Sequence, residues 1–280
     1  MNHTHYNFNT KDNLSLFARA WLTSQPEPKG IVHLVHGLGE HSGRYDHVGK
    51  ALNDAGFHLV SFDLRGHGLS QGKKGHAPSF EHFLDDVQVF WNDAKTRFAD
   101  IENRFLYGHS LGGNIVIQYG LHHPFELSGV IATSPALSLS YQPPKLKLIA
   151  AKILSHLLPS LTVKNALDTS ALSRDQAVVQ AYRDDVYVHD LISTKLSMGL
   201  IDSGATALEQ AENWTLPLLL MHGTSDQITS HEASQSFKKK AGELVELVLW
   251  EDSYHELHND LDKERVIEKI IFWLNAHSYV

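Results

Sequence analysis

The chain has 280 residues, of which 42% are hydrophobic and 20% are charged, and its formal net charge is -8. This composition is typical of a globular protein and argues against a disordered or fibrous chain. An acidic chain gives nucleic-acid phosphates no electrostatic reason to approach, so we expect no nucleic-acid partner. Because the sequence contains no cysteine, disulfides, a thiol nucleophile and cysteine-ligated metals are excluded.

The sequence gives no sign of a targeting or membrane-spanning segment. Residues 1–6 are polar and lack the basic start and apolar run of a signal peptide. No stretch reaches the roughly 18 consecutive apolar residues that a membrane span needs. We therefore expect a cytoplasmic protein, long enough for one large core domain with an insertion.

Short apolar runs bounded by glycine or polar turns are predicted to be strands. The alternating stretch 14–21 has the pattern of an antiparallel edge strand. The later runs, predicted to be buried strands, are 31–35, 57–62, 104–107, 129–132, 216–221 and 244–250. Segments with helical spacing alternate with these runs, at 80–91, 114–121 and 266–274. This alternation predicts an α/β fold with a mostly parallel central sheet flanked by helices.

The alternation stops between residues 139 and 213. A Pro-Pro pair interrupts this stretch, and no strand-like run occurs before Leu216. We interpret 139–213 as a helical cap, or lid, inserted into an α/β core made of 1–138 and 214–280.

The first predicted cap helix, 145–158, is apolar around more than half of its circumference. Its apolar face carries Leu146, Ile149, Ala150, Ile153, Leu154 and Leu157. Two interpretations remain open: the face packs onto the core, or it belongs to a lid that touches lipid or lines an acyl channel.

The strongest chemical signal is Gly108-His109-Ser110-Leu111-Gly112, which follows one predicted strand directly and precedes a predicted helix. A serine on such a strained strand-to-helix turn exposes its hydroxyl at the sheet edge, and small flanking residues let the backbone pass without clashes. Ser110 is therefore the candidate nucleophile.

A serine hydroxyl needs a base within hydrogen-bond reach, and the base needs a third group to orient it. Asp226 and His255 each follow a predicted strand, and parallel strands deliver their carboxyl ends to one edge of a sheet. The chain order Ser110, Asp226, His255 also fits this type of triad. The alternatives that the sequence leaves open are His258 for the base and Asp202 or Asp252 for the acid.

The glycine-rich turn 36–41 lies where this architecture needs a second oxyanion donor, so the backbone amides of Leu38 and Leu111 are the predicted oxyanion hole. The string His255-Glu256-Leu257-His258 differs from a zinc-protease motif because its histidines are three residues apart, whereas that motif spaces them by four. We expect no metal and no cofactor.

Four motifs together resemble one branch of the α/β-hydrolase superfamily, the monoacylglycerol lipase and lysophospholipase-like branch. They are 36–45, 63–70, 108–113 and 254–258. In the expected cap, 172–174 and 181–185 also look like this branch. The resemblance spans nearly the whole chain and implies an α/β-hydrolase that hydrolyses carboxylic esters, with monoacylglycerols as the expected substrates.

The resemblance also implies roles for individual residues. It implies the same nucleophile, acid, base and oxyanion amides as the residue pattern does. It further places Glu40, Arg44 and His258 near a pocket for the polar glycerol head, with a structural ion pair at the cap hinge as the alternative.

Several functions remain open on this scaffold. A lysophospholipase, a general short-chain carboxylesterase, a serine peptidase, an acyltransferase and a catalytically silent ligand-binding homologue share the same core. We expect a small acyl-ester substrate as the partner and transient contact of the cap with a membrane surface. The sequence does not predict the oligomeric state.

Overall fold

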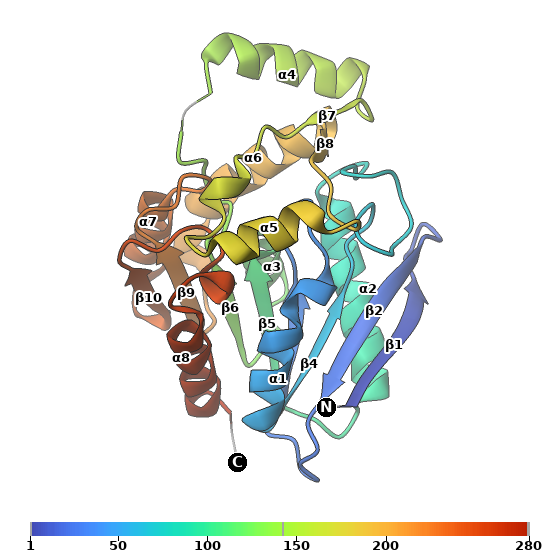
Figure 1. Cartoon of the computed structure of the whole chain (residues 1–280), viewed down its shortest axis with the longest axis vertical. Helices are drawn as coiled ribbons and strands as arrows, with labels where there is room; N and C mark the ends of the chain where they lie inside the picture. The colour runs from blue at the N-terminus through green and yellow to red at the C-terminus, as the bar shows by residue number, and fades with distance from the viewer. Residues whose placement is uncertain (1, 142, 279–280) are drawn as a thin grey trace.

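The computed structural model describes residues 2–141 and 143–278, and its centre is an eight-stranded sheet (Figure 1). In spatial order its strands are β1 (Asn2–Asn9), β2 (Ser15–Leu22), β4 (Phe57–Phe62), β3 (Gly30–Val35), β5 (Arg104–His109), β6 (Gly129–Thr133), β9 (Leu218–Gly223) and β10 (Val245–Trp250). All neighbours from β4 to β10 pair in parallel, and only the pairs β1–β2 and β2–β4 are antiparallel. The predicted mostly parallel sheet is confirmed.

All six runs predicted to be buried strands belong to this sheet, but two predictions were wrong: 244–250 is the edge strand β10, in which only Val245 is buried, and 14–21 is not an edge strand. Residues 14–21 correspond to β2, which pairs with β4 on one side and with β1 on the other. The outer strand is β1, along which Phe8 pairs with Leu16. Its sequence is mostly polar and contains no apolar run from which a strand could be predicted.

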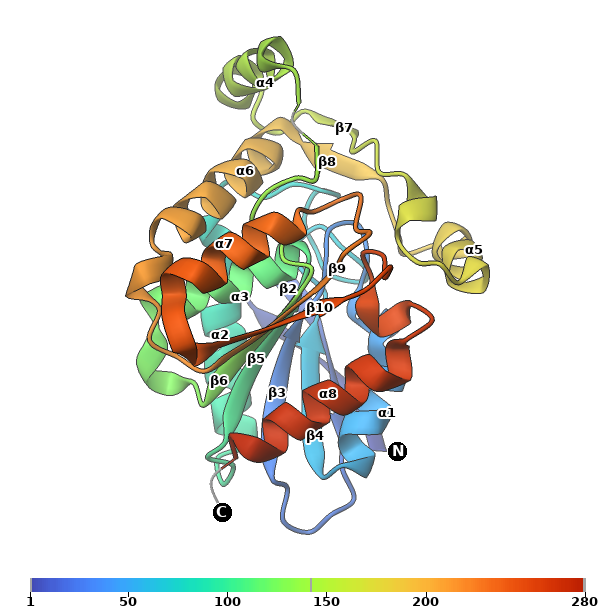
Figure 2. The same ribbon diagram turned by 90° about the vertical axis from the view of Figure 1, so that its left-hand side faces the viewer.

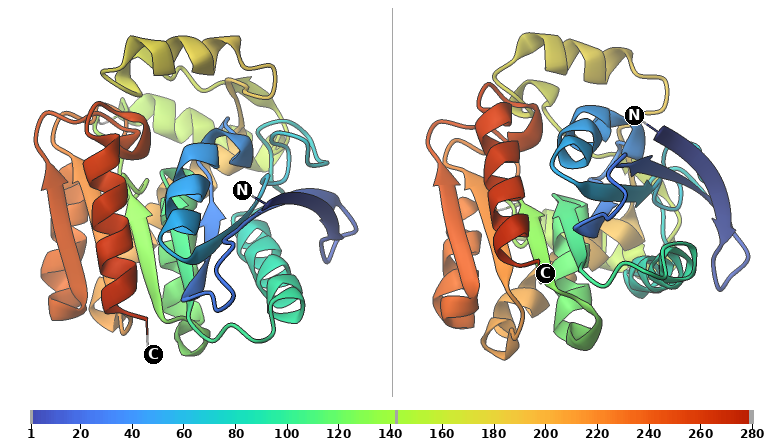
Figure 3. Two further views of the ribbon diagram at one scale, coloured as in Figure 1. Left: turned by 60° about the horizontal axis from the view of Figure 1, so that its bottom comes forward. Right: turned by 90° about the horizontal axis from the view of Figure 1, so that it is seen from below.

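Helices cover both faces of the sheet (Figures 2 and 3). One face carries α1 (Asp46–Asp54) and α8 (Lys263–Ala276). The other carries α2 (Glu81–Arg97), α3 (Leu111–His122) and α7 (His231–Ala241). Short 3-10 helices join these elements: η1 (Ser42–Tyr45), η2 (Pro124–Glu126), η5 (Gly242–Leu244) and η6 (Leu257–Asn259).

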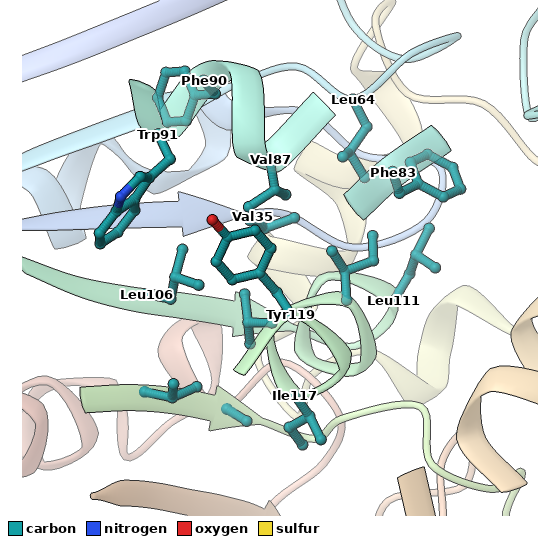
Figure 4. Packing of buried hydrophobic residues seen from close by; sticks show 14 of the residues in the cluster. Val35, Leu64, Phe83, Val87, Phe90, Trp91, Leu106, Leu111, Ile117 and Tyr119 are labelled. Carbon is teal, nitrogen blue, oxygen red and sulfur yellow. The ribbon is translucent and has the colours of Figure 1, made fainter. Parts of the chain in front are cut away.

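The core consists of two apolar clusters, one on each face of the sheet. All six residues of β3 are buried; Val32 and Leu34 join the cluster under α1 and α8, whereas Ile31 and Val35 join the other. Figure 4 shows the second cluster, where aromatic rings of α2 and α3 such as Trp91 pack beside strand residues. Packing on both faces holds the strand ends, and hence the loops that follow them, in fixed positions.

The segment between β6 and β9, residues 134–217, is called the β6–β9 segment here. It contains α4 (Lys145–Leu157), β7 (Thr162–Lys164), η3 (Thr169–Ala171), α5 (Gln176–Asp184), β8 (Leu191–Ser193), α6 (Thr194–Glu209) and η4 (Ala211–Asn213). It forms the upper layer in Figure 2. Strands β7 and β8 pair antiparallel, which the sequence did not predict because three residues are too few to display a pattern.

Helix α4 is predicted correctly in sequence, but its apolar face does not pack onto the core. Leu146 is 78% exposed and Leu157 is 71% exposed, whereas Ser155 is buried. The helix lies against α6 and stands apart from the sheet (Figure 1). Of the two interpretations of this face, packing onto the core is therefore wrong.

Among the described residues, no helix combines the length and the apolar character needed to cross a bilayer.

Candidate active site

Ser110 occupies the strained turn that its motif predicts. It lies between the end of β5 and the start of α3 with φ 54° and ψ -114°, a conformation that non-glycine residues rarely adopt. A Cβ atom on Gly108 would lie 2.2 Å from the carbonyl oxygen of Gly112, and one on Gly112 would lie 2.0 Å from that of Val35. The two flanking glycines are therefore required for the turn to form.

Asp226 and His255 meet at the carboxyl ends of β9 and β10. The Nδ1 atom of His255 lies 2.7 Å from Oδ2 of Asp226, so the carboxylate accepts a hydrogen bond from the imidazole N–H. Oδ1 of Asp226 accepts hydrogen bonds from the backbone N–H groups of Ile228 and Thr229. The acid is thereby held in one orientation toward the imidazole.

Two further side chains contact this carboxylate, and sequence reasoning missed both. The Thr229 hydroxyl donates to Oδ2 of Asp226 at 2.9 Å, and Nε2 of His222 lies 3.1 Å from the same oxygen. His222 stands four residues before Asp226, at the end of β9, and this spacing is the signal that could have found it. Both contacts favour the ionised acid.

The two titratable side chains shift each other's pKa. Burial raises the pKa of Asp226, but the neighbouring His255 and His222 together outweigh it and bring the pKa of this carboxyl well below its usual range. Burial likewise disfavours the charged imidazole, yet the Asp226 carboxylate and its hydrogen bond raise the pKa of His255 above the ordinary value. The pair therefore favours a proton on the imidazole.

Ser110 and His255, but not Asp226, line a common cavity of about 360 Å³ between the strand ends and the β6–β9 segment. The core contributes Leu38, Ser110, Leu111 and His255 to its wall. The β6–β9 segment contributes mainly apolar side chains, among them Leu139, Leu172, Ile192, Leu200 and Ile201. An elongated apolar molecule with one reactive polar group matches such a wall.

The glycine turn after β3 approaches the serine closely. A Cβ atom on Gly37 would lie 3.3 Å from Cβ of Ser110, and Gly39 has φ 81°. Leu111 is the first residue of α3, so its N–H has no acceptor within the helix. The amides of Leu38 and Leu111 thus belong to residues of the cavity wall beside Ser110.

Of the three side chains expected near a polar head group, only Glu40 lines the cavity. Among the described residues that line the cavity are Glu40 and Glu256, but neither Arg44 nor His258. Arg44 donates to Glu40 at 2.8 Å and to both oxygens of Glu256 at 2.6 and 2.7 Å. Its guanidinium also lies over the Tyr182 ring of α5. For Arg44 the structure therefore favours the alternative of a structural ion pair.

His258 is fully buried behind the cavity. Its ring stacks on Tyr45 with 4.6 Å between ring centroids and meets the edge of His109 at 4.8 Å. Neither ring nitrogen has a hydrogen-bond partner among the described residues. Burial lowers the pKa of His258 well below the usual value, so the ring is neutral. This position differs from the expected contact with a head group.

The alternative acids lie elsewhere. Asp202 belongs to α6, and Asp252 occupies an exposed turn where its backbone N–H donates to Thr224. Among the described contacts of these three acids, only Asp226 forms a hydrogen bond with His255. The geometry favours Asp226.

A family model described as serine aminopeptidase, S33, matches residues 26–262. The chain belongs to this family. A monoacylglycerol lipase of Mycolicibacterium smegmatis is 34% identical over 257 residues, which cover 91% of each chain. An uncharacterised abhydrolase domain-containing protein of Dictyostelium discoideum is 38% identical over 96% of this chain, but the chain spans only 28% of that protein's length.

The solved structures agree with this membership. The crystal structure of Paleococcus ferrophilus monoacylglycerol lipase has a TM-score of 0.84 and 37% sequence identity, and the match covers 99% of this chain and 100% of that one. This chain is therefore a serine hydrolase of the α/β-hydrolase fold, as the sequence predicted.

Proposed function

We propose that this serine hydrolase cleaves monoacylglycerols into a fatty acid and glycerol. The observation that carries the proposal is a His255 imidazole hydrogen-bonded to Asp226 in the same cavity wall as Ser110, which sits on a strained turn. The largely apolar wall suits an acyl chain, and the similar proteins that are named as monoacylglycerol lipases support the choice of substrate.

The first half of the proposed reaction forms an acyl-enzyme. The Ser110 hydroxyl attacks the ester carbonyl while Nε2 of His255 takes its proton, because Nδ1 is engaged by Asp226. The amides of Leu38 and Leu111 donate to the oxyanion, each such donor being worth roughly 10² to 10³ in kcat. The imidazolium then protonates the glycerol oxygen, which leaves.

The second half releases the fatty acid. His255 removes a proton from a water molecule that attacks the Ser110 ester, and the resulting imidazolium returns the proton to the serine oxygen. Asp226 stabilises the imidazolium in both halves. These steps are proton transfers and acyl transfers, so the proposed reaction uses no cofactor.

We further propose that residues 139–213 act as a cap, and that α4 lets this cap touch a membrane surface. The support is chemical: α4 exposes apolar side chains such as Ile149 and Ile153, and its sequence contains lysines but no acidic residue. A helix with these properties partitions to the boundary between head groups and acyl chains. Contact there would bring the cavity close to its lipid substrate.

Replacing the nucleophile tests the proposal. Ser110→Ala should lower kcat for fatty-acid release from a monoacylglycerol by about 10⁶-fold, because the triad acts as a unit. Ser236→Ala, at an exposed serine of α7, is the matched control and should keep wild-type activity. If Ser110→Ala retained more than a few per cent of the activity, the assignment would be refuted.

A substrate panel separates the remaining alternatives. Hydrolysis rates of monoacylglycerol, lysophosphatidylcholine, p-nitrophenyl butyrate and an aminoacyl amide should rank monoacylglycerol first. Preference for lysophosphatidylcholine would favour a lysophospholipase, and preference for the amide would favour a peptidase. Failure of a fluorophosphonate probe to label Ser110 would favour the catalytically silent alternative.

A further inference from the structure

The loop that carries His255 is attached to the β6–β9 segment directly after the histidine, and before it through Asp260. The backbone N–H of Tyr254, immediately before it, donates to Oδ2 of Asp260 at 2.9 Å. The backbone N–H of Glu256, immediately after it, donates to the carbonyl oxygen of Leu172 at 2.8 Å. The position of the imidazole therefore depends on Asp260 and on residue 172, which lies more than eighty residues earlier in the chain.

Asp260 is itself held by the same short stretch of the β6–β9 segment. Its side chain is 0% exposed. Oδ1 accepts from the backbone N–H of Arg174 at 2.8 Å and from the Ser173 hydroxyl at 3.2 Å, and Oδ2 accepts from Nε of Arg174 at 2.9 Å. With the bond from Tyr254, one buried carboxylate gathers four donors.

Arg174 adds two further contacts to the same region. Its Nη2 atom donates to the Ser253 hydroxyl at 3.1 Å and to Asp262 at 2.7 Å. Ser253 lies two residues before His255, and Asp262 lies just before α8. A guanidinium has several donors in a fixed plane, so one side chain can hold these groups at set distances.

We propose that Arg174, acting through Asp260, is a positioning residue for His255, so that the β6–β9 segment sets the geometry of the catalytic base. This inference rests on the proposed function, in which His255 is that base. Removing the guanidinium would leave the buried Asp260 carboxylate with three of its four donors but without its cationic partner, and the uncompensated charge favours a shift of the carboxylate. The Tyr254 amide, and His255 with it, would follow.

The experiment compares steady-state kinetics of the full chain on p-nitrophenyl acetate. This soluble ester has a short acyl group that offers little apolar surface to the wall of the β6–β9 segment, so an altered acyl site should affect it little. Arg174→Ala should lower kcat roughly 10- to 100-fold, as expected for a shift of about 1 Å in a catalytic group, while KM changes less than about twofold. Arg174→Lys, which keeps the charge, should restore part of kcat.

Two further variants keep the test decisive. Asp260→Asn replaces one acceptor oxygen of Asp260, the partner of Arg174, and should also lower kcat with little change in KM. Arg183→Ala is the matched control, since this exposed arginine of α5 contacts Thr169 within the same segment. It should behave as wild type. Circular dichroism gives the folded fraction, so that kcat refers to folded protein.

Three outcomes contradict the inference. It is overturned if folded Arg174→Ala and Asp260→Asn keep kcat within about twofold of wild type, or if their losses appear in KM alone. It is also overturned if the wild-type protein neither hydrolyses the ester nor labels with a fluorophosphonate, a result that would first refute the proposed function. A hydrolytically active wild type with unaffected variants refutes the positioning role alone.

Discussion

At the scale of single residues, the site combines backbone strain with buried charge. Holding Ser110 in a left-handed conformation costs on the order of 1–3 kcal/mol. The buried cation Arg44 is enclosed by the carboxylates of Glu40 and Glu256 and by the Tyr182 ring. Glu40 in turn accepts the N–H of Gly37, so this ion pair reaches the turn that precedes the predicted oxyanion amide.

The pH dependence of the reaction follows from the raised pKa of His255. A general base must be neutral, so kcat/KM should rise with pH along a single limb whose midpoint lies above about 6.5, the ordinary value for histidine. His109 should not contribute to this limb, because burial lowers its pKa to about 4. The check is a profile of kcat/KM for a soluble ester between roughly pH 5 and pH 9. A midpoint below that of free histidine would contradict the expected effect of Asp226.

At the scale of elements, helix α6 approaches the chain just after β6 closely at one of its two glycines. A Cβ atom on Gly204 would lie 2.4 Å from the carbonyl oxygen of Leu137, just after β6. A Cβ atom on Gly199, on the same helix, would meet its nearest neighbour, Phe80, at 3.5 Å, an ordinary contact distance. The two glycines therefore differ in purpose: only Gly204 allows a close approach of backbones.

The two positions predict opposite effects of the same substitution. Gly199→Ala should raise the free energy of unfolding by about 1 kcal/mol, because alanine favours a helix more than glycine does. Gly204→Ala should lower it by roughly 1–3 kcal/mol, because α6 must move away from residue 137. Urea unfolding of both variants measures the difference. Equal effects would mean that α6 does not approach residue 137 as closely as described.

At the scale of the whole molecule, the cavity lies between two layers, the sheet and the β6–β9 segment. The mostly parallel sheet is packed on both faces. Helix α4 lies above α6 at the outside of the molecule (Figure 2), and its apolar side chains are exposed. The proposed catalytic residues thus follow strands of the sheet, and the proposed lipid contact lies on the outer layer. The Arg174–Asp260 pair joins the two layers beside His255.

The proposed membrane contact predicts a separation of binding from catalysis. Replacing Leu146, Ile153 and Leu157 together by glutamine should weaken binding to phospholipid vesicles by about tenfold or more, since each exposed side chain loses apolar area that lipid would bury. Vesicle sedimentation measures this. Hydrolysis of a soluble ester should not change, because none of the three lines the described cavity.

The control for this prediction is Phe125→Gln. Phe125 is 99% exposed but lies on η2, between α3 and β6, away from the β6–β9 segment. It should bind vesicles as wild type does. Wild-type vesicle binding by the triple variant would exclude α4 as the contact.

The sequence by itself determined the buried strands and the loops that follow them. An apolar run that ends in a polar turn marks both a strand and its carboxyl end. The pattern therefore predicted that Ser110, Asp226 and His255 each follow the end of a strand. The role of the glycines beside Ser110 was also predicted from the sequence, because a strained turn tolerates few other residues. These features are local, and local chemistry records them.

Only the tertiary structure decided which distant groups meet. The mostly polar strand β1, the outward face of α4, the burial of Arg44 between two carboxylates and the attachment of the His255 loop to residues 172–174 carry no local signature. Each depends on which face of an element is covered and on which charges become partners after burial. Those outcomes are set by packing between segments far apart in the chain, which no periodicity within a single segment can encode.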